Sequence, residues 1–117
     1  VRWFRTSRGL MQLCHGLGPN DLAGVTPQRT AEDLADDPDL QGLLAEPGLR
    51  LVLNGHTHRP MVRAIGGLTI VNAGTLEQNQ NPGVALIDLD DKSVMWVPLT
   101  EGGALAPSLL GTIGSGE

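Results

Sequence analysis

The three histidines of this 117-residue chain share one sequence context. His15, His56 and His58 each lie in a glycine-flanked loop directly after an apolar segment of the kind that forms a strand. Ligands of open α/β sheets gather beyond the carboxyl ends of strands, so these loops could meet at one site. Neutral imidazole binds Mn, Fe, Zn and Ni, and two ions about 4 Å apart can clamp a phosphoryl group during in-line displacement. The pattern therefore predicts a metal-binding site.

Each histidine taken alone also fits a simpler interpretation. A histidine after a strand is commonly a surface or hydrogen-bonded residue, and this alternative stays open for His15. His56 and His58 are two residues apart, so they would share a face on an extended segment but could diverge on a turn to bind two neighbouring ions. The case for a metal site rests on the joint pattern, because every histidine in the chain lies in such a loop.

The order of expected strands and helices around these loops predicts a mixed sheet with helices on its outer face. This is an α/β (α+β) fold. Strands are expected over residues 2–5, 10–14, 50–54, 61–65, 68–72, 84–89 and 93–97. Short helices are expected over 31–35 and 38–45, with Thr30 and Asp37 as N-caps. Residues 1–98 would form one domain, and residues 99–117, rich in Gly, Pro and Ser, are expected to be a flexible C-terminal tail.

Four segments together resemble the calcineurin-like metallophosphoesterases. Residues 51–60, LVLNGHTHRP, resemble the G-H-x-H signature that closes the active site of this family. Residues 13–16, LCHG, are similar to the block before it, a lone histidine followed by glycine at a strand end. Residues 70–76 resemble the N-x-G-[ST] segment, and the hairpin that begins with residues 83–89 is similar to that of small bacterial members. The resemblance covers about residues 10–97 in consistent order.

The resemblance implies a dinuclear phosphoesterase that hydrolyses phosphate mono- or diesters, with a small phosphoester or a nucleotide as substrate. It implies a four-layer αββα sandwich, of which this chain would be the C-terminal half. His15 and His56 would be ligands of one ion and His58 a ligand of the other, with a bridging hydroxide as nucleophile. Manganese is the expected metal, with Fe, Zn or Ni as alternatives. The resemblance assigns no catalytic residue to this half.

Three further residues are candidates for supporting roles. Asn72 matches a structural turn that supports the family's site. Asp21 could orient a ligand histidine without binding the metal itself, although loop aspartates more often cap turns. Arg59 could contact a phosphate or could simply be a solvated side chain at a strand edge.

The chain also departs from the family pattern. The earlier blocks D-x-H, G-D and G-N-H-[DE], which supply the remaining ligands, do not occur in it. Three histidines cannot complete the shells of two ions, so we expect weak metal binding and no activity from this chain alone. Exposed strand edges would then favour a homo-oligomer. A non-catalytic scaffold on the same fold and an independent three-histidine zinc domain remain alternatives.

Composition narrows the remaining function classes. Eight Lys and Arg residues against thirteen Asp and Glu give a net charge of −5, which argues against a nucleic-acid partner. No apolar run is long enough to span a membrane, and no secretory signal is visible. The single cysteine, Cys14, cannot form an internal disulfide, so a cytoplasmic location is expected.

Overall fold

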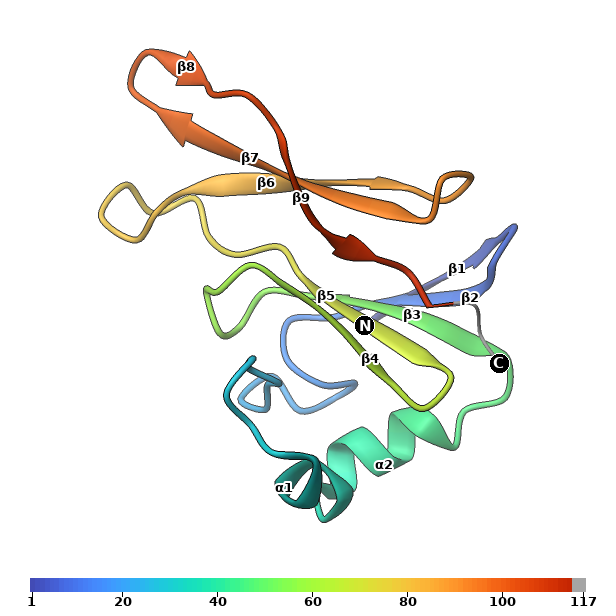
Figure 1. The fold of residues 1–117 in the computed structure, drawn as a ribbon. Helices are drawn as coiled ribbons and strands as arrows, with labels where there is room; N and C mark the ends of the chain where they lie inside the picture. The colour runs from blue at the N-terminus through green and yellow to red at the C-terminus, as the bar shows by residue number, and fades with distance from the viewer. Residues whose placement is uncertain (115–117) are drawn as a thin grey trace.

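The computed structural model describes residues 1–114, which form two β-sheets and two short helices (Figure 1). The first sheet has the strand order β1-β2-β3-β5-β4. Its strands are β1 (Arg2–Thr6), β2 (Gly9–Leu13), β3 (Leu49–Asn54), β4 (Met61–Ile65) and β5 (Leu68–Asn72). The three inner strands run parallel and the two edge strands are antiparallel to their neighbours, so the predicted mixed sheet is confirmed.

The second sheet is antiparallel and is centred on β7 (Ser93–Thr100). This strand pairs with β6 (Gly83–Asp88), β8 (Gly103–Ala104) and β9 (Ser108–Thr112). The segments expected as strands over 61–65 and 68–72, and over 84–89 and 93–97, form the antiparallel hairpins β4–β5 and β6–β7.

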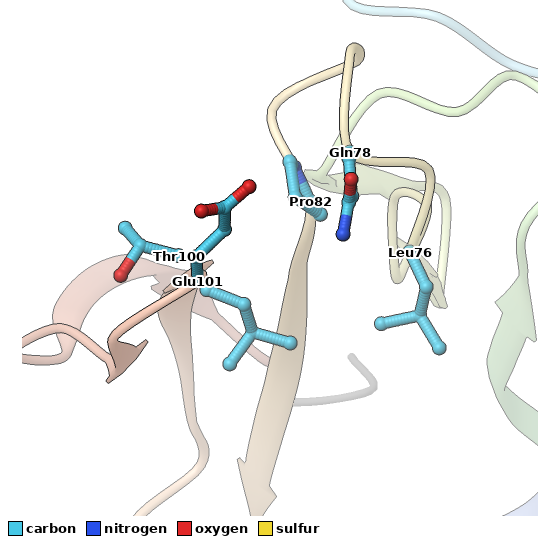
Figure 2. A pocket seen from close by; sticks show the side chains of 6 residues that line it. Leu76, Gln78, Pro82, Thr100 and Glu101 are labelled. Atoms are coloured by element: carbon cyan, nitrogen blue, oxygen red, sulfur yellow. The ribbon is translucent and has the colours of Figure 1, made fainter.

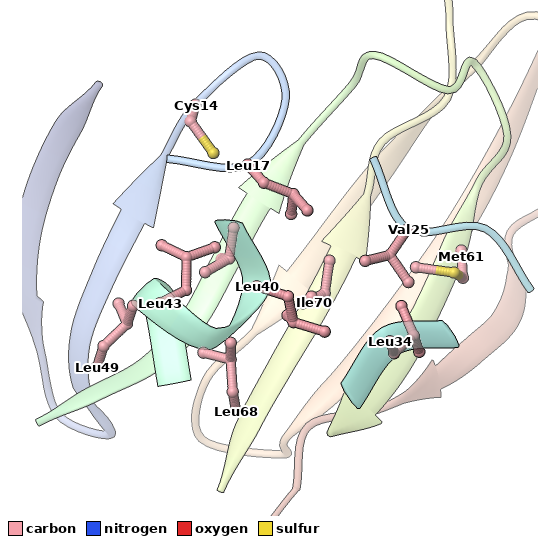
Figure 3. Packing of buried hydrophobic residues seen from close by; sticks show 11 residues of the cluster. Cys14, Leu17, Val25, Leu34, Leu40, Leu43, Leu49, Met61, Leu68 and Ile70 are labelled. Carbon is pink, nitrogen blue, oxygen red and sulfur yellow. The ribbon is translucent and has the colours of Figure 1, made fainter. Parts of the chain in front are cut away.

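Two apolar cores define three layers. One core lies between the helices and the first sheet and contains Val52 and Ile70 of the sheet, both fully buried (Figure 3). The other lies between the two sheets and contains Leu51 and Val71. Neighbouring residues of one strand thus enter opposite cores, because side chains alternate across a strand. The described residues contain no helical layer on the far side of the second sheet, so the four-layer sandwich stays a prediction.

The helices begin at the predicted caps. Helix α1 (Ala31–Ala35) follows Thr30, whose hydroxyl accepts a hydrogen bond from the N–H of Asp33 at 3.1 Å. Helix α2 (Pro38–Leu44) follows Asp37, whose carboxylate accepts two N–H bonds from the first turn. Partial burial raises the pKa of Asp37, but the hydrogen bonds from the helix and from Arg29 outweigh this effect and hold the pKa below its ordinary value. Neither helix is long and apolar enough to cross a membrane.

The C-terminal segment contains strands that the sequence did not reveal. Residues 99–117 were expected to be a tail without regular structure, but β7 extends to Thr100, and β8 and β9 follow it. Strand β9 pairs with β7, and Ile113, 6% exposed, completes the core between the sheets. Gly111 packs on Val62 of β4, where a Cβ atom would come within 2.7 Å of the valine. Residues 115–117 of the expected tail lie outside the described residues.

Candidate functional site

The carboxyl ends of β2, β3 and β5 meet at one edge of the first sheet. In the register of these parallel strands Leu13 lies beside Leu53, and Asn54 lies beside Asn72. The loops that leave these ends cover residues 14–30, 55–60 and 73–82. The topology therefore brings both histidine loops to the same edge, where α/β sheets commonly bind ligands.

His15 and His56 face each other across this edge. Nε2 of His15 lies 3.3 Å from Nδ1 of His56, and the ring planes are inclined by 69° with centroids 5.2 Å apart. Two nitrogens bound to one tetrahedral ion at about 2.0–2.1 Å are about 3.3–3.4 Å apart, and somewhat closer in an octahedral shell. The 3.3 Å contact is a hydrogen bond between the two rings, and the same distance would suit two ligands of one metal ion.

Backbone hydrogen bonds hold this pair together. The carbonyl of His15 accepts bonds from the N–H groups of Gly55, at 3.2 Å, and of His56, at 2.9 Å. The N–H of Cys14 donates to the carbonyl of Leu53 at 3.0 Å and continues the β2–β3 ladder into the loops. These bonds hold the backbones of the two loops side by side, and the side-chain torsions of the two histidines then set the distance between their rings.

Asn54 supports the loop of His15, a role that the sequence motifs did not indicate. Its side chain is 3% exposed, and its amide donates to the carbonyl of Gly16 at 3.0 Å, which fixes the loop just after His15. Gly16 itself tolerates no side chain, because a Cβ atom would collide with the carbonyl of Asn20. An amide that ends an apolar strand directly before Gly-His is the signal that could have identified Asn54.

Cys14 belongs to the same support and does not act as a thiolate. Its thiol is buried and lies 3.3 Å from the carbonyl oxygen of Gly16, to which it donates. Burial raises the pKa of the Cys14 thiol, which keeps it protonated. Cys14 is therefore a buried residue directly after β2 whose thiol supports the loop.

His58 points toward a different part of the site. Its backbone has φ +60°, a left-handed conformation that costs a residue with a Cβ roughly 1–2 kcal/mol. Its Nδ1 lies 2.8 Å from Oε1 of Gln80 in the 73–82 loop. Among residues 1–114 no three His, Cys, Asp or Glu side chains converge as a metal-binding group. The structure thus brings His15 and His56 together and directs His58 elsewhere.

The other candidate residues differ in their relation to the site. Asn72 is fully buried and joins two of the loops, because its amide donates to Oγ1 of Thr57 at 2.6 Å and its oxygen accepts from the N–H of Gly74 at 2.9 Å. Asp21 is exposed and makes no hydrogen bond to a histidine within the described chain. Arg59 is exposed, and its guanidinium donates to Gln28 at 3.3 Å.

A pocket of about 380 Å³ lies between the 73–82 loop and the turn after β7 (Figure 2). Its lining residues are Leu76, Gln78, Pro82, Leu99, Thr100 and Glu101. None of the three histidines lines this pocket, so it is separate from the histidine pair.

Comparison with known proteins gives one match. A family model described as the calcineurin-like phosphoesterase superfamily domain matches residues 10–92, which include both histidine loops. Searches of curated proteins and of solved structures found no significant match. Members of the matched superfamily usually bind divalent metals. Because the match covers well over half of its length, the chain belongs to the calcineurin-like phosphoesterase superfamily.

Proposed function

We propose that the chain takes part in the metal-dependent hydrolysis of phosphate mono- or diesters, with His15 and His56 as ligands of one divalent ion. The observation that carries this proposal is the 3.3 Å approach of Nε2 of His15 to Nδ1 of His56, on loops joined by their backbones. The superfamily match supports the class of reaction. Small phosphoesters and nucleotides are the proposed substrates.

The two imidazoles fit a metal ion in part. They would occupy two positions of the shell and leave two to four others for water, phosphate oxygens or residues from outside this chain. A bound Mn, Fe, Zn or Ni ion would supply Lewis acidity toward the phosphate ester. The role of His15 and His56 is to hold the ion at the sheet edge, and that of Asn54 is to keep their loops in register. His58, whose ring contacts Gln80 and not the pair, is the proposed ligand of a second ion.

Hydrolysis tests this function when it is measured on the protein expressed from its complete gene, so that any metal ligands from outside this chain are included. The assay would use p-nitrophenyl phosphate and bis(p-nitrophenyl) phosphate with Mn, Fe, Zn or Ni. We expect metal-dependent hydrolysis that falls at least about 100-fold in His56→Ala, and no change in Glu32→Gln, an exposed residue of helix α1 outside the three loops of the site. No hydrolysis of either ester with any of the four metals, or full activity in His56→Ala, would contradict the proposal.

A non-catalytic interaction module is the second candidate. It is favoured by one observation, the lack of a convergent group of three metal-binding side chains in the described part of the chain. It predicts that His56→Ala leaves the biological activity of the protein intact. A loss of that activity together with loss of bound metal would argue against it.

A further inference from the structure

We infer that Gln80 and Glu77 are positioning residues that hold His58 in the tautomer with its proton on Nδ1 and its lone pair on Nε2. The inference rests on the proposed function, because it prepares Nε2 of His58 as a metal ligand. It starts from two side-chain contacts in the 73–82 loop. Oε1 of Gln80 lies 2.8 Å from Nδ1 of His58, and Nε2 of Gln80 donates to Oε2 of Glu77 at 2.6 Å.

The Glu77 carboxylate decides which end of the Gln80 amide faces the histidine. A carboxylate only accepts hydrogen bonds, so it must take the NH₂ end of the amide. The oxygen of the amide is then turned toward His58, and an amide oxygen also only accepts. Nδ1 of His58 must therefore carry the proton. Because a neutral imidazole has a single N–H, Nε2 keeps its lone pair free.

Hydrogen bonds of the backbone hold the segments that carry His58, Glu77 and Gln80. The N–H of Gln80 donates to the carbonyl of Glu77 at 3.0 Å, and the N–H of Glu77 donates to Oγ1 of Thr75 at 3.1 Å. The N–H of Gly83 donates to the carbonyl of Thr75 at 3.0 Å and closes the loop. On the other side, the N–H of His58 donates to the carbonyl of Gly55 at 3.1 Å. The backbone segments that carry both partners of the 2.8 Å contact are thus held by hydrogen bonds.

A fixed tautomer matters for metal binding. A histidine ligand usually donates its second ring N–H to a protein acceptor, and loss of that acceptor typically lowers metal affinity by 10–100-fold. Gln80 is 22 residues away from His58 along the chain and belongs to neither histidine motif. The contact therefore assigns a positioning role to a loop that carries no ligand of its own.

The test is the tautomer of His58 in the metal-free 117-residue chain, measured from the side-chain nitrogen shifts in long-range ¹H–¹⁵N NMR spectra. We expect the Nδ1–H form in the wild type and a shift toward the Nε2–H form in Gln80→Ala. Glu77→Ala should give a mixture, because the free amide can turn. Gln78→Ala is the matched control, an exposed glutamine of the same loop without a bond to His58, and should leave the tautomer unchanged.

Zinc titration of the same variants adds a second readout and separates the two proposals. Gln80→Ala should weaken the zinc affinity measured at His58 by about 10–100-fold. A wild-type His58 protonated on Nε2, or a tautomer unchanged by Gln80→Ala, overturns the inference whatever the metal does. A tautomer that shifts as expected, in a chain whose His58 signals do not respond to zinc, supports the positioning contact and counts against the proposed function.

Discussion

Replacing Asn72 by alanine should lower the free energy of unfolding by about 2–4 kcal/mol. The side chain is fully buried and makes two hydrogen bonds, to Thr57 at 2.6 Å and from Gly74 at 2.9 Å. Each bond is worth roughly 0.5–1.5 kcal/mol, and the cavity and the partners left behind add to the loss. The bonds join the 55–60 and 73–82 loops, so the same change should also loosen the surroundings of His58.

Urea unfolding followed by circular dichroism measures this loss. Asn79→Ala is the matched control, because Asn79 is exposed in the same loop region, and its removal should cost no more than about 0.5 kcal/mol. Thr57→Val keeps the shape of the threonine but removes its hydroxyl. If Asn72 and Thr57 act through one hydrogen bond, the loss of unfolding free energy in the double variant should be about 0.5–3 kcal/mol smaller than the sum of the losses in the two single variants. A loss below about 1 kcal/mol in Asn72→Ala, or strictly additive losses, would refute this reasoning.

Three further predictions concern backbone conformation, packing and charge. His58→Gly should be about 1 kcal/mol more stable than His58→Ala in thermal unfolding, because φ is +60° at this position; the reverse order would show that no strain is present. Gly83→Ala should destabilise the protein by about 1–3 kcal/mol and alter Trp96 fluorescence, because a Cβ atom at this position collides with the indole ring. Gly42→Ala in helix α2 is the contrasting variant: a Cβ atom there meets open space, so it should stabilise the protein by about 0.5–1 kcal/mol. Burial raises the pKa of Asp37, but the hydrogen bonds that its carboxylate accepts lower it below the ordinary value of an aspartate. The unfolded chain therefore binds this proton more tightly, and stability is lost as the pH falls from the ordinary pKa through the lowered one. Asp37→Asn should flatten this acid limb in a pH series of thermal unfolding, and an unchanged limb would contradict the assignment.

Local signals account for the elements that the sequence predicted well. Thr30 and Asp37 mark both helix starts, because an N-cap acts on N–H groups within three residues of itself. The alternate burial of Leu51 and Val52 follows from an apolar run between two cores. Strand β9 was missed because glycine, proline and serine surround it and its burial does not alternate clearly: Leu109 is 62% exposed, and a glycine, Gly111, faces Val62.

In the candidate site, too, local sequence patterns predicted some features and contacts between distant residues determine the others. The convergence of His15 and His56 follows from their places at the ends of neighbouring parallel strands. The supporting contacts do not follow from any motif, because they join residues far apart in sequence: Asn54 reaches Gly16 across 38 residues, and Gln80 reaches His58 across 22. Which side chain lies beside a ligand depends on loop conformation, which only the folded chain specifies.

A manganese titration of the 117-residue chain tests the central claim most directly, with the histidine side chains observed by ¹H–¹⁵N NMR. Paramagnetic Mn²⁺ broadens the signals of nuclei that lie close to it. If His15 and His56 bind one ion through the nitrogens that face each other at 3.3 Å, their signals should broaden together at the lowest Mn²⁺ concentrations, and His15→Ala should abolish the effect on His56. Broadening of His56 that is unchanged in His15→Ala, or no selective broadening of either ring, would contradict the shared metal site.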